Sequence, residues 1–246
     1  MVAWAFHGSP PAHAGPPAYV VNHGDGTVSV VDTASNAVVT TVTVGSEPLA
    51  AAVHPAGSRA FVTNQTAPTG SVSVIDTAAN GVVATIPLGN RPSGAAVKLP
   101  GDRLYVTNRD DKTVSVVDTG TLAVVGDPIA VGNNPLGVAV NPAGTPAYVV
   151  NKGSNNVSVI DTATNAVIAT IPVGNDPGHV AVSPDGLRAY VTNSRVFARP
   201  SSVSRWSRRR KRISTCSGSR KIPSRRACRC STCARAGSWG DRKSVV

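Results

Sequence analysis

Short runs in which apolar residues alternate with small or polar residues fill most of this chain, and they recur with a nearly fixed period. The clearest run reads Tyr/Phe-Val-Thr/Val-Asn, and its copies begin at Tyr19, Phe61, Tyr105, Tyr148 and Tyr190. Successive copies are 42, 44, 43 and 42 residues apart. Alternation with a period of two, in runs rich in Val, Ile and Thr, predicts half-buried antiparallel strands, whereas helical periodicity is absent.

Three further features follow in fixed order within each period. A VSV(V/I)DT run begins at Val28, Val72, Val114 and Val157. A β-rich run such as VVATIPLG, which ends at Gly89, comes next, and a Gly-x-x-Pro link then leads into a small apolar strand and a turn. Each period of about 43 residues therefore offers four strands, which predicts an all-β fold built from the blades of a β-propeller.

The YVTN runs at 105–108 and 190–193, together with VSVIDT and the Gly-Asn-x-Pro link, resemble the YVTN-repeat β-propellers. This family includes archaeal surface-layer proteins and many bacterial envelope or secreted proteins, and the resemblance covers residues 18–194. It implies a location at the cell surface or outside the cell. Because family members typically form seven blades, the chain resembles a truncated or frameshifted member.

We expect three complete blades at residues 48–88, 92–131 and 135–173. A first blade without its innermost strand and a last blade with only its first two strands should flank them. The sequence therefore favours an incomplete ring of about four blades. The alternative is a closed four-bladed ring in which the strand near Val180 pairs with the blade that begins at Tyr19 and removes its exposed edge.

Charge divides the chain into regions. Residues 1–194 hold 8 Lys and Arg against 12 Asp and Glu, whereas residues 195–246 hold 16 against 1, so the net charge of +11 comes from the tail alone. All four cysteines also lie in the tail. We therefore expect an irregular segment at 1–17, propeller repeats at 18–194, and a basic, Ser/Arg/Cys-rich tail at 195–246 that is disordered.

Three interpretations of the tail stay open: a basic arm, a small cysteine-based metal site, or a stretch translated out of frame from a gene that continued the propeller. The CRCSTC spacing lacks the paired C-x2–4-C arrangement of structural zinc sites, so no metal is predicted. The RRRKR run at 208–212 could hold polyanions, and we keep polyanion binding as a second alternative function.

The strands expected to line the central channel contain almost no reactive groups. They read LAAAVHP, SGAAVKL, LGVAVNP and GHVAVSP, and only His54, Lys98 and His179 stand out. The chain also lacks a C-x-x-C-H haem motif, a G-x-S-x-G nucleophile elbow and a Gly-rich phosphate loop. We predict that the protein is not an enzyme and holds no cofactor. A redox or lactonase-like propeller enzyme, whose site is lost or unrecognised in this chain, is the main alternative.

Two sets of loops should share one edge of the propeller: the Gly-x-x-Pro links and the loops between second and third strands. Such loops carry binding residues more often than strands do. The candidate contact residues are Arg91, Arg109, Asp110, Asp111, Lys112, Lys152, Asp176 and His179. Their mixed charges suit a protein or glycan of the cell envelope, so we predict a non-catalytic binding scaffold. The sequence shows no signal peptide and no membrane span.

Overall fold

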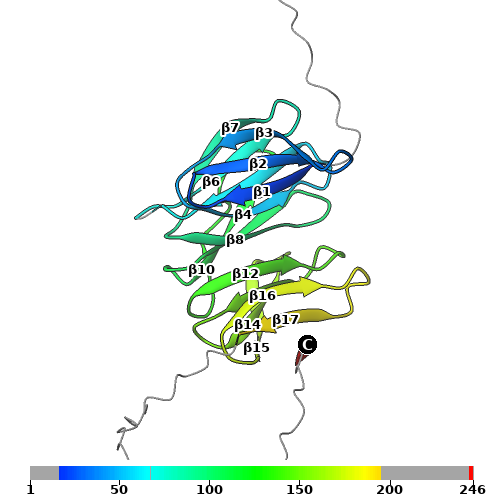
Figure 1. The fold of residues 1–246 in the computed structure, drawn as a ribbon. Coiled ribbons are helices and arrows are strands. Elements are labelled where there is room, and N and C mark those ends of the chain that lie inside the picture. The colour runs from blue at the N-terminus through cyan, green and yellow to red at the C-terminus, as the bar shows by residue number, and fades with distance from the viewer. Residues whose placement is uncertain (1–16, 67, 195–243, 246) are drawn as a thin grey trace, which may run out of the picture. The chain divides into compact units, whose positions relative to one another are not determined.

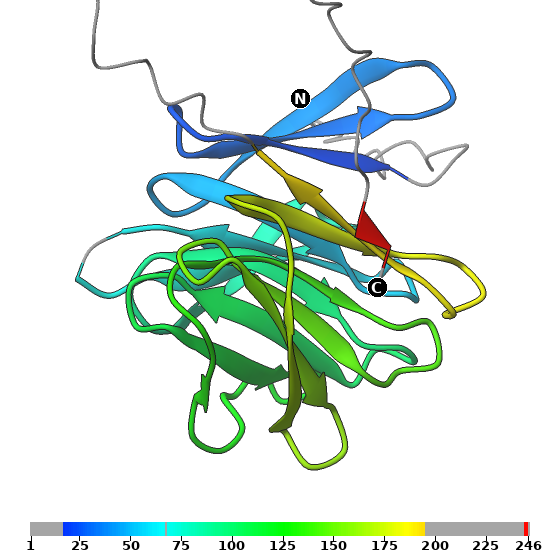
Figure 2. The ribbon, with the colours of Figure 1, turned by 90° about the horizontal axis from the view of Figure 1, so that it is seen from below.

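The computed structural model describes residues 17–66, 68–194 and 244–245, and the regular elements in these ranges are all β-strands (Figures 1 and 2). In chain order the strands are β1 (Ala18–Asn22), β2 (Thr27–Asp32), β3 (Ala37–Thr43), β4 (Pro48–Val53), β5 (Arg59–Asn64), β6 (Ser71–Asp76), β7 (Gly81–Pro87), β8 (Pro92–Val97), β9 (Arg103–Asn108), β10 (Thr113–Asp118), β11 (Ile129–Ala130), β12 (Pro135–Val140), β13 (Ala147–Asn151), β14 (Asn156–Asp161), β15 (Ala166–Pro172), β16 (Pro177–Val182), β17 (Ala189–Asn193) and β18 (Ser244–Val245). The predicted all-β class is confirmed. Among the described residues, no helix is long and apolar enough to cross a membrane.

The strands form five antiparallel sheets, each built from neighbours in the chain. The first sheet is β1–β2–β3, the second β4–β5–β6–β7, the third β8–β9–β10–β11, the fourth β12–β13–β14–β15 and the fifth β16–β17–β18. The three four-stranded sheets coincide with the three predicted complete blades. In the described residues β1 pairs with β2 alone and β16 pairs with β17, so the alternative of a ring closed by β16 against β1 is wrong.

The fifth sheet contains a strand that the repeat does not predict. Ser244 and Val245 form β18, which pairs with Val191 and Tyr190 of β17. In the complete sheets the third strand takes this position beside the second. The other residues of the predicted disordered tail, 195–243 and 246, and residues 1–16 of the predicted irregular N-terminal segment lie outside the described part of the chain.

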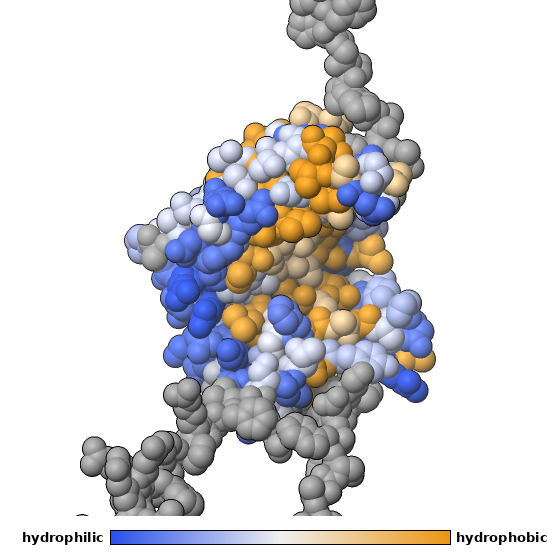
Figure 3. Space-filling model, viewed as in Figure 1, coloured by the Kyte–Doolittle hydropathy of each residue, from blue (hydrophilic) through white to orange (hydrophobic). Residues whose placement is uncertain are grey.

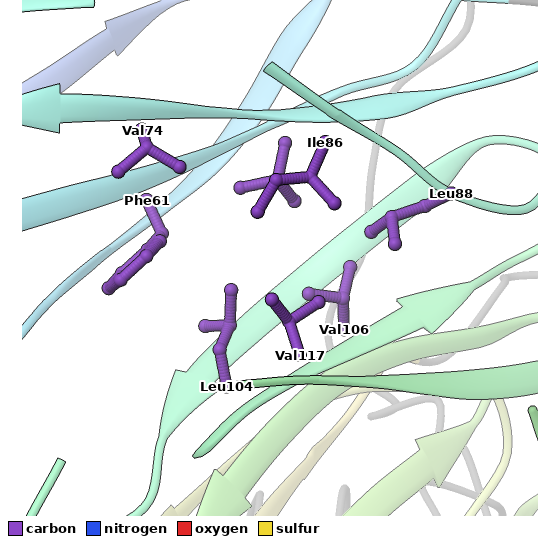
Figure 4. Close-up of a cluster of buried hydrophobic side chains, with 8 residues drawn as sticks. Phe61, Val74, Ile86, Leu88, Leu104, Val106 and Val117 are labelled. Atoms are coloured by element: carbon purple, nitrogen blue, oxygen red, sulfur yellow. The ribbon is translucent and has the colours of Figure 1, made fainter. Parts of the chain in front are cut away.

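Clusters of apolar side chains between neighbouring sheets join the five sheets in chain order. The cluster between the second and third sheets consists of Phe61, Val72, Val74, Ile86, Leu88, Leu104, Val106 and Val117 (Figure 4). Within the repeat, Phe61 faces the following sheet, whereas Val106 faces the preceding one. Full burial of a side chain of this size contributes about 1.5–3 kcal/mol. A register slip of one residue would turn both side chains to the wrong face, so the alternation fixes the register.

In the second and third sheets, a threonine of the second strand forms a hydrogen bond to the next sheet. The inner strands β4, β8, β12 and β16 each have a register shift near their start, which leaves one N–H without a partner in the ladder. Thr107 Oγ1 accepts this N–H from Gly94 at 2.8 Å and donates to the carbonyl of Leu136 in the fourth sheet at 2.7 Å. Thr63 makes the equivalent bonds in the second sheet. The Thr hydroxyl of YVTN thus accepts the N–H that the register shift leaves unpaired, and it donates a hydrogen bond to a carbonyl of the neighbouring sheet.

Candidate binding rim

Links and loops meet at one edge of the sheets. The strand register pairs the link proline of each inner strand with the last Asn of YVTN, as in Pro92 with Asn108 and Pro135 with Asn151. The links therefore lie beside the loops that follow β5, β9 and β13. We call this edge the rim and define it as links 45–47, 89–91, 132–134 and 174–176 and loops 65–70, 109–112 and 152–155, of which residue 67 is not described. Hydrophilic residues gather along the left edge in Figure 3, where these loops lie in Figure 1.

The same backbone frame occurs four times along the rim. The residue before each link proline has a positive φ of 50–51°. Its carbonyl accepts the N–H of the residue that follows YVTN at 3.0–3.1 Å. Four different pairs of side chains occupy this frame: Glu47 with Gln65, Arg91 with Arg109, Asn134 with Lys152, and Asp176 with Ser194. The rim is therefore a repeated scaffold that carries variable side chains.

The side chain of the Asn of YVTN packs against the link glycine of each frame. Asn108 is fully buried, and its Nδ2 donates to Thr113 Oγ1 at 3.0 Å and to Ser115 Oγ at 2.8 Å. Its equivalents in the second and fourth sheets make the same pattern of bonds. The link glycine leaves room for this side chain, because a Cβ on Gly89 would lie 2.9 Å from Asn108 Cγ. The repeat showed that these two residues recur, but only the structure shows that they contact each other.

On the third sheet, four of the predicted contact residues come together. The Asp111 carboxylate accepts the backbone N–H and the Nδ2 of Asn90, each at 2.7 Å. Arg91 Nη1 lies 3.9 Å from Asp110 Oδ2. The Nε of Arg109 is buried and has no hydrogen-bond partner among the described residues. Both acidic side chains thus have partners within the rim, whereas Arg109 has no ion-pair partner among the residues that the structure describes.

The predicted lysines lie on adjoining loops. The Lys112 carbonyl accepts the N–H of Val131 at 2.9 Å, at the start of the next link, and Lys152 donates its N–H to the carbonyl of Asn134 at the end of that link, at 3.0 Å. Neither ammonium group has an ion-pair partner in the part of the chain that the structure describes. A continuous path of backbone contacts therefore runs from Lys112 to Lys152.

The remaining two candidates are separated. Asp176 lies on the rim in the fifth sheet, where its N–H donates to Asn155 Oδ1 at 2.9 Å. His179 lies within strand β16 instead of a loop, and its N–H donates to Thr192 Oγ1 at 3.1 Å. His179 was predicted both within the inner-strand run GHVAVSP and as a rim contact, and it lies in the strand, which begins at the link proline.

The inner strands were expected to be nearly free of ionisable groups. In β4, β8, β12 and β16 the only ionisable side chain is that of His179. His54 and Lys98 lie in the turns just after β4 and β8, where His54 Nδ1 accepts the Ala56 N–H at 3.1 Å and Lys98 Nζ lies 3.3 Å from Asp102 Oδ2. Within the described ranges, no group of three or more His, Cys, Asp or Glu residues is placed to hold a metal. The absence of a cofactor and of catalysis stays a prediction.

No protein-family model and no curated protein matches this chain. Among solved structures, Kuenenia stuttgartiensis hydrazine synthase matches with 28% identity over 72% of this chain and 52% of that chain, at a TM-score of 0.66. A functionally unknown protein from Desulfotomaculum acetoxidans DSM 771 matches with 19% identity, over 72% of this chain and 59% of that one, at a TM-score of 0.65. The dihydro-heme d1 dehydrogenase NirN in complex with DHE matches with 19% identity, over 75% and 41% of the two chains, at a TM-score of 0.60.

This chain thus spans about half the length of the solved chains that it matches. The shared feature is a β-propeller-like arrangement of antiparallel sheets. The chain has a β-propeller-like fold.

Proposed function

We propose that this protein is a YVTN-type propeller scaffold at the cell surface or in the cell envelope, whose rim binds a protein or glycan without catalysis. The observation that carries the proposal is the repeated frame of the rim, which has one backbone geometry and four different side-chain pairs. A surface of this kind separates folding from recognition. The buried Asn and the link Gly set the frame, while the outward side chains are available for a ligand.

The inner strands support binding over catalysis. Two of the similar solved structures are enzymes by name, hydrazine synthase and a dehydrogenase. An active site needs convergent acids, bases, nucleophiles or cofactor ligands. The inner strands of the described sheets offer His179 alone, whereas the rim of the third sheet brings together two arginines and two aspartates within a few residues.

The test compares two double variants of the full chain on an array of envelope glycans and surface-protein peptides. Arg109→Glu with Lys152→Glu reverses two charges on the rim. Lys98→Glu with Arg188→Glu reverses two charges at the opposite ends of the strands and serves as the matched control. The rim variant should lose the signals that the wild type gives, and the control should keep them. Both variants keep the basic tail, so equal binding by all three proteins would overturn the proposal and favour the tail.

A further inference from the structure

Charge is unevenly distributed over equivalent positions of the rim. The frame carries Glu47 in the second sheet and Asp176 in the fifth sheet, and neither of these frames contains a cation. The frames of the third and fourth sheets carry cations instead, and the loop after β9 adds Lys112. The rim cations of the repeats are Arg91, Arg109, Lys112 and Lys152. The third and fourth sheets thus differ from the sheets on either side in the cations that their rim segments carry.

On the rim of these two sheets the only carboxylates are Asp110 and Asp111, which cancel part of the charge of the four cations and leave an excess of positive charge. Asp111 accepts two hydrogen bonds from Asn90, and Asp110 faces Arg91. Arg91 and Arg109 are joined by a backbone hydrogen bond of 3.1 Å, so two guanidinium side chains start from adjacent points. An anion placed against this edge is attracted by the excess of positive charge. The local chemistry therefore selects an anionic partner.

The side chains on these segments favour carboxylates of a polypeptide. A guanidinium binds a carboxylate through two parallel N–H donors, a geometry that an ammonium does not supply. The links and loops of the third and fourth sheets contain no aromatic residue on which a sugar ring could stack. In an extended peptide, alternate carboxylates project from the same face about 7 Å apart, which suits a row of cations along consecutive loops.

We infer that the rim of the third and fourth sheets binds an acidic polypeptide segment through Arg91, Arg109, Lys112 and Lys152. The inference rests on the proposed binding function of the rim and names its ligand class. Because the contacts are exposed ion pairs, binding should weaken as salt concentration rises.

The experiment must separate the rim from the basic tail, so the readout is specific to each lysine. A decapeptide of alternating Glu and Ser is activated with carbodiimide and mixed with the full-length protein, and the lysine adducts are mapped by mass spectrometry. The yields are normalised to acetylation by a neutral reagent. Adducts at Lys112 and Lys152 should exceed those at Lys98 by about fivefold, as two exposed charge pairs allow.

The variant Arg91→Gln with Arg109→Gln should reduce the adducts at both rim lysines by about fivefold. The control Arg188→Gln should leave them unchanged, and circular dichroism should show that both variants keep the strand content of the wild type. Adducts confined to the tail lysines Lys211, Lys221 and Lys243 would overturn the inference. So would rim adducts that the double Arg variant does not reduce.

An oligogalacturonate with the same number of carboxylates is activated and tested in parallel. Stronger labelling of the rim lysines by this glycan than by the peptide would overturn the choice of a polypeptide and leave the proposed function intact. If neither polymer labels the rim but the rim charge-reversal variant still loses its array signals, the anionic ligand is wrong and the binding rim stands. If neither polymer labels the rim and the charge-reversal variant keeps its array signals, the proposed function is wrong as well.

Discussion

Replacement of Gly94 by Ala tests the packing of inner strands that sets the spacing of the rim loops. A Cβ on Gly94 would meet the carbonyl oxygen of Leu136 at a separation that real side chains do not show, and it would lie 3.2 Å from the Val138 nitrogen. Because these are backbone atoms, the strands β8 and β12 must move apart. Overpacking of this kind costs about 1–3 kcal/mol. The movement also strains the bond from the Gly94 N–H to Thr107, which contributes about 1 kcal/mol.

The free energy of unfolding should therefore fall by about 2–4 kcal/mol, which lowers the melting temperature by about 4–16 °C for a domain of this size. The second sheet carries Ala50 at this position, which shows that a junction can accommodate a methyl group and argues for the lower end of the range.

Gly137→Ala and Gly81→Ala are the graded controls for this prediction. The nearest atom to a Cβ on Gly137 would be 3.0 Å away, so we expect a smaller loss of stability. A Cβ on Gly81 would meet nothing within 4 Å, and its equivalents are Ala37 and Ala166. Gly81→Ala should raise stability by about 0.4–1 kcal/mol, because the unfolded chain loses freedom. Differential scanning calorimetry measures all three variants. Equal melting temperatures for Gly94→Ala and Gly81→Ala would refute the packing argument.

Three more predictions concern the side-chain hydrogen bonds of Tyr105 and Thr107 and the ionisation of Tyr105. Tyr105→Phe should lower the free energy of unfolding in urea by about 1 kcal/mol, because the hydroxyl donates to Asn165 Oδ1 at 2.9 Å. Tyr19→Phe should not lower it, because that buried hydroxyl has no partner among the described residues, and an equal loss would contradict the assignment. Burial raises the pKa of Tyr105 to about 12, whereas an unfolded tyrosine ionises near pH 10. The folded state then retains a proton that the unfolded state releases. The contribution of the neutral Tyr105 hydroxyl to the free energy of unfolding is therefore complete below about pH 10 and is lost as the pH rises towards 12. Tyr105→Phe should flatten the dependence of the free energy of unfolding on pH in this range. Thr107→Val should reduce stability by about 1–3 kcal/mol and speed amide exchange at Gly94, whose N–H loses its acceptor, and unchanged exchange would exclude this bond.

The strands and the limits of the blades could be predicted because their signals are local. Each strand carries its own alternation, and the turn residues recur in phase, so β4 through β15 fall where the period places them. The fourth strand of the third sheet is the exception, since β11 has only two residues. Before it, Leu122 adopts a φ of 58° at a turn position where the other repeats have Asn, and Pro128 lacks an N–H for the ladder.

The contacts that build the rim could not be predicted from the repeat. The packing of Asn108 beneath Gly89 and the bonds of Thr107 to two sheets depend on distances between segments that the period does not give. His179, two positions beyond the link proline Pro177, was predicted both in an inner strand and as a rim contact. That proline is already the first residue of β16, and a strand position removes His179 from the loops.

The same contacts explain why a loss of binding in the rim variants can be assigned to the ligand. The frame depends on the buried Asn108 amide, the link glycine and a backbone hydrogen bond, and none of these uses the side chains of Arg91 or Arg109. The Arg91 side chain is 38% exposed, and exposed substitutions usually change stability by less than about 0.5 kcal/mol. Arg109 is partly buried, but its buried Nε has no partner among the described residues, so Gln at this position breaks no hydrogen bond of that Nε. Arg91 is in a left-handed conformation, but the equivalent positions hold Glu, Asn and Asp, so a Gln side chain at this position adds no new strain. A rim variant that unfolds would therefore show that the arginines contribute to folding, and would contradict the separation of frame and recognition on which both proposals depend.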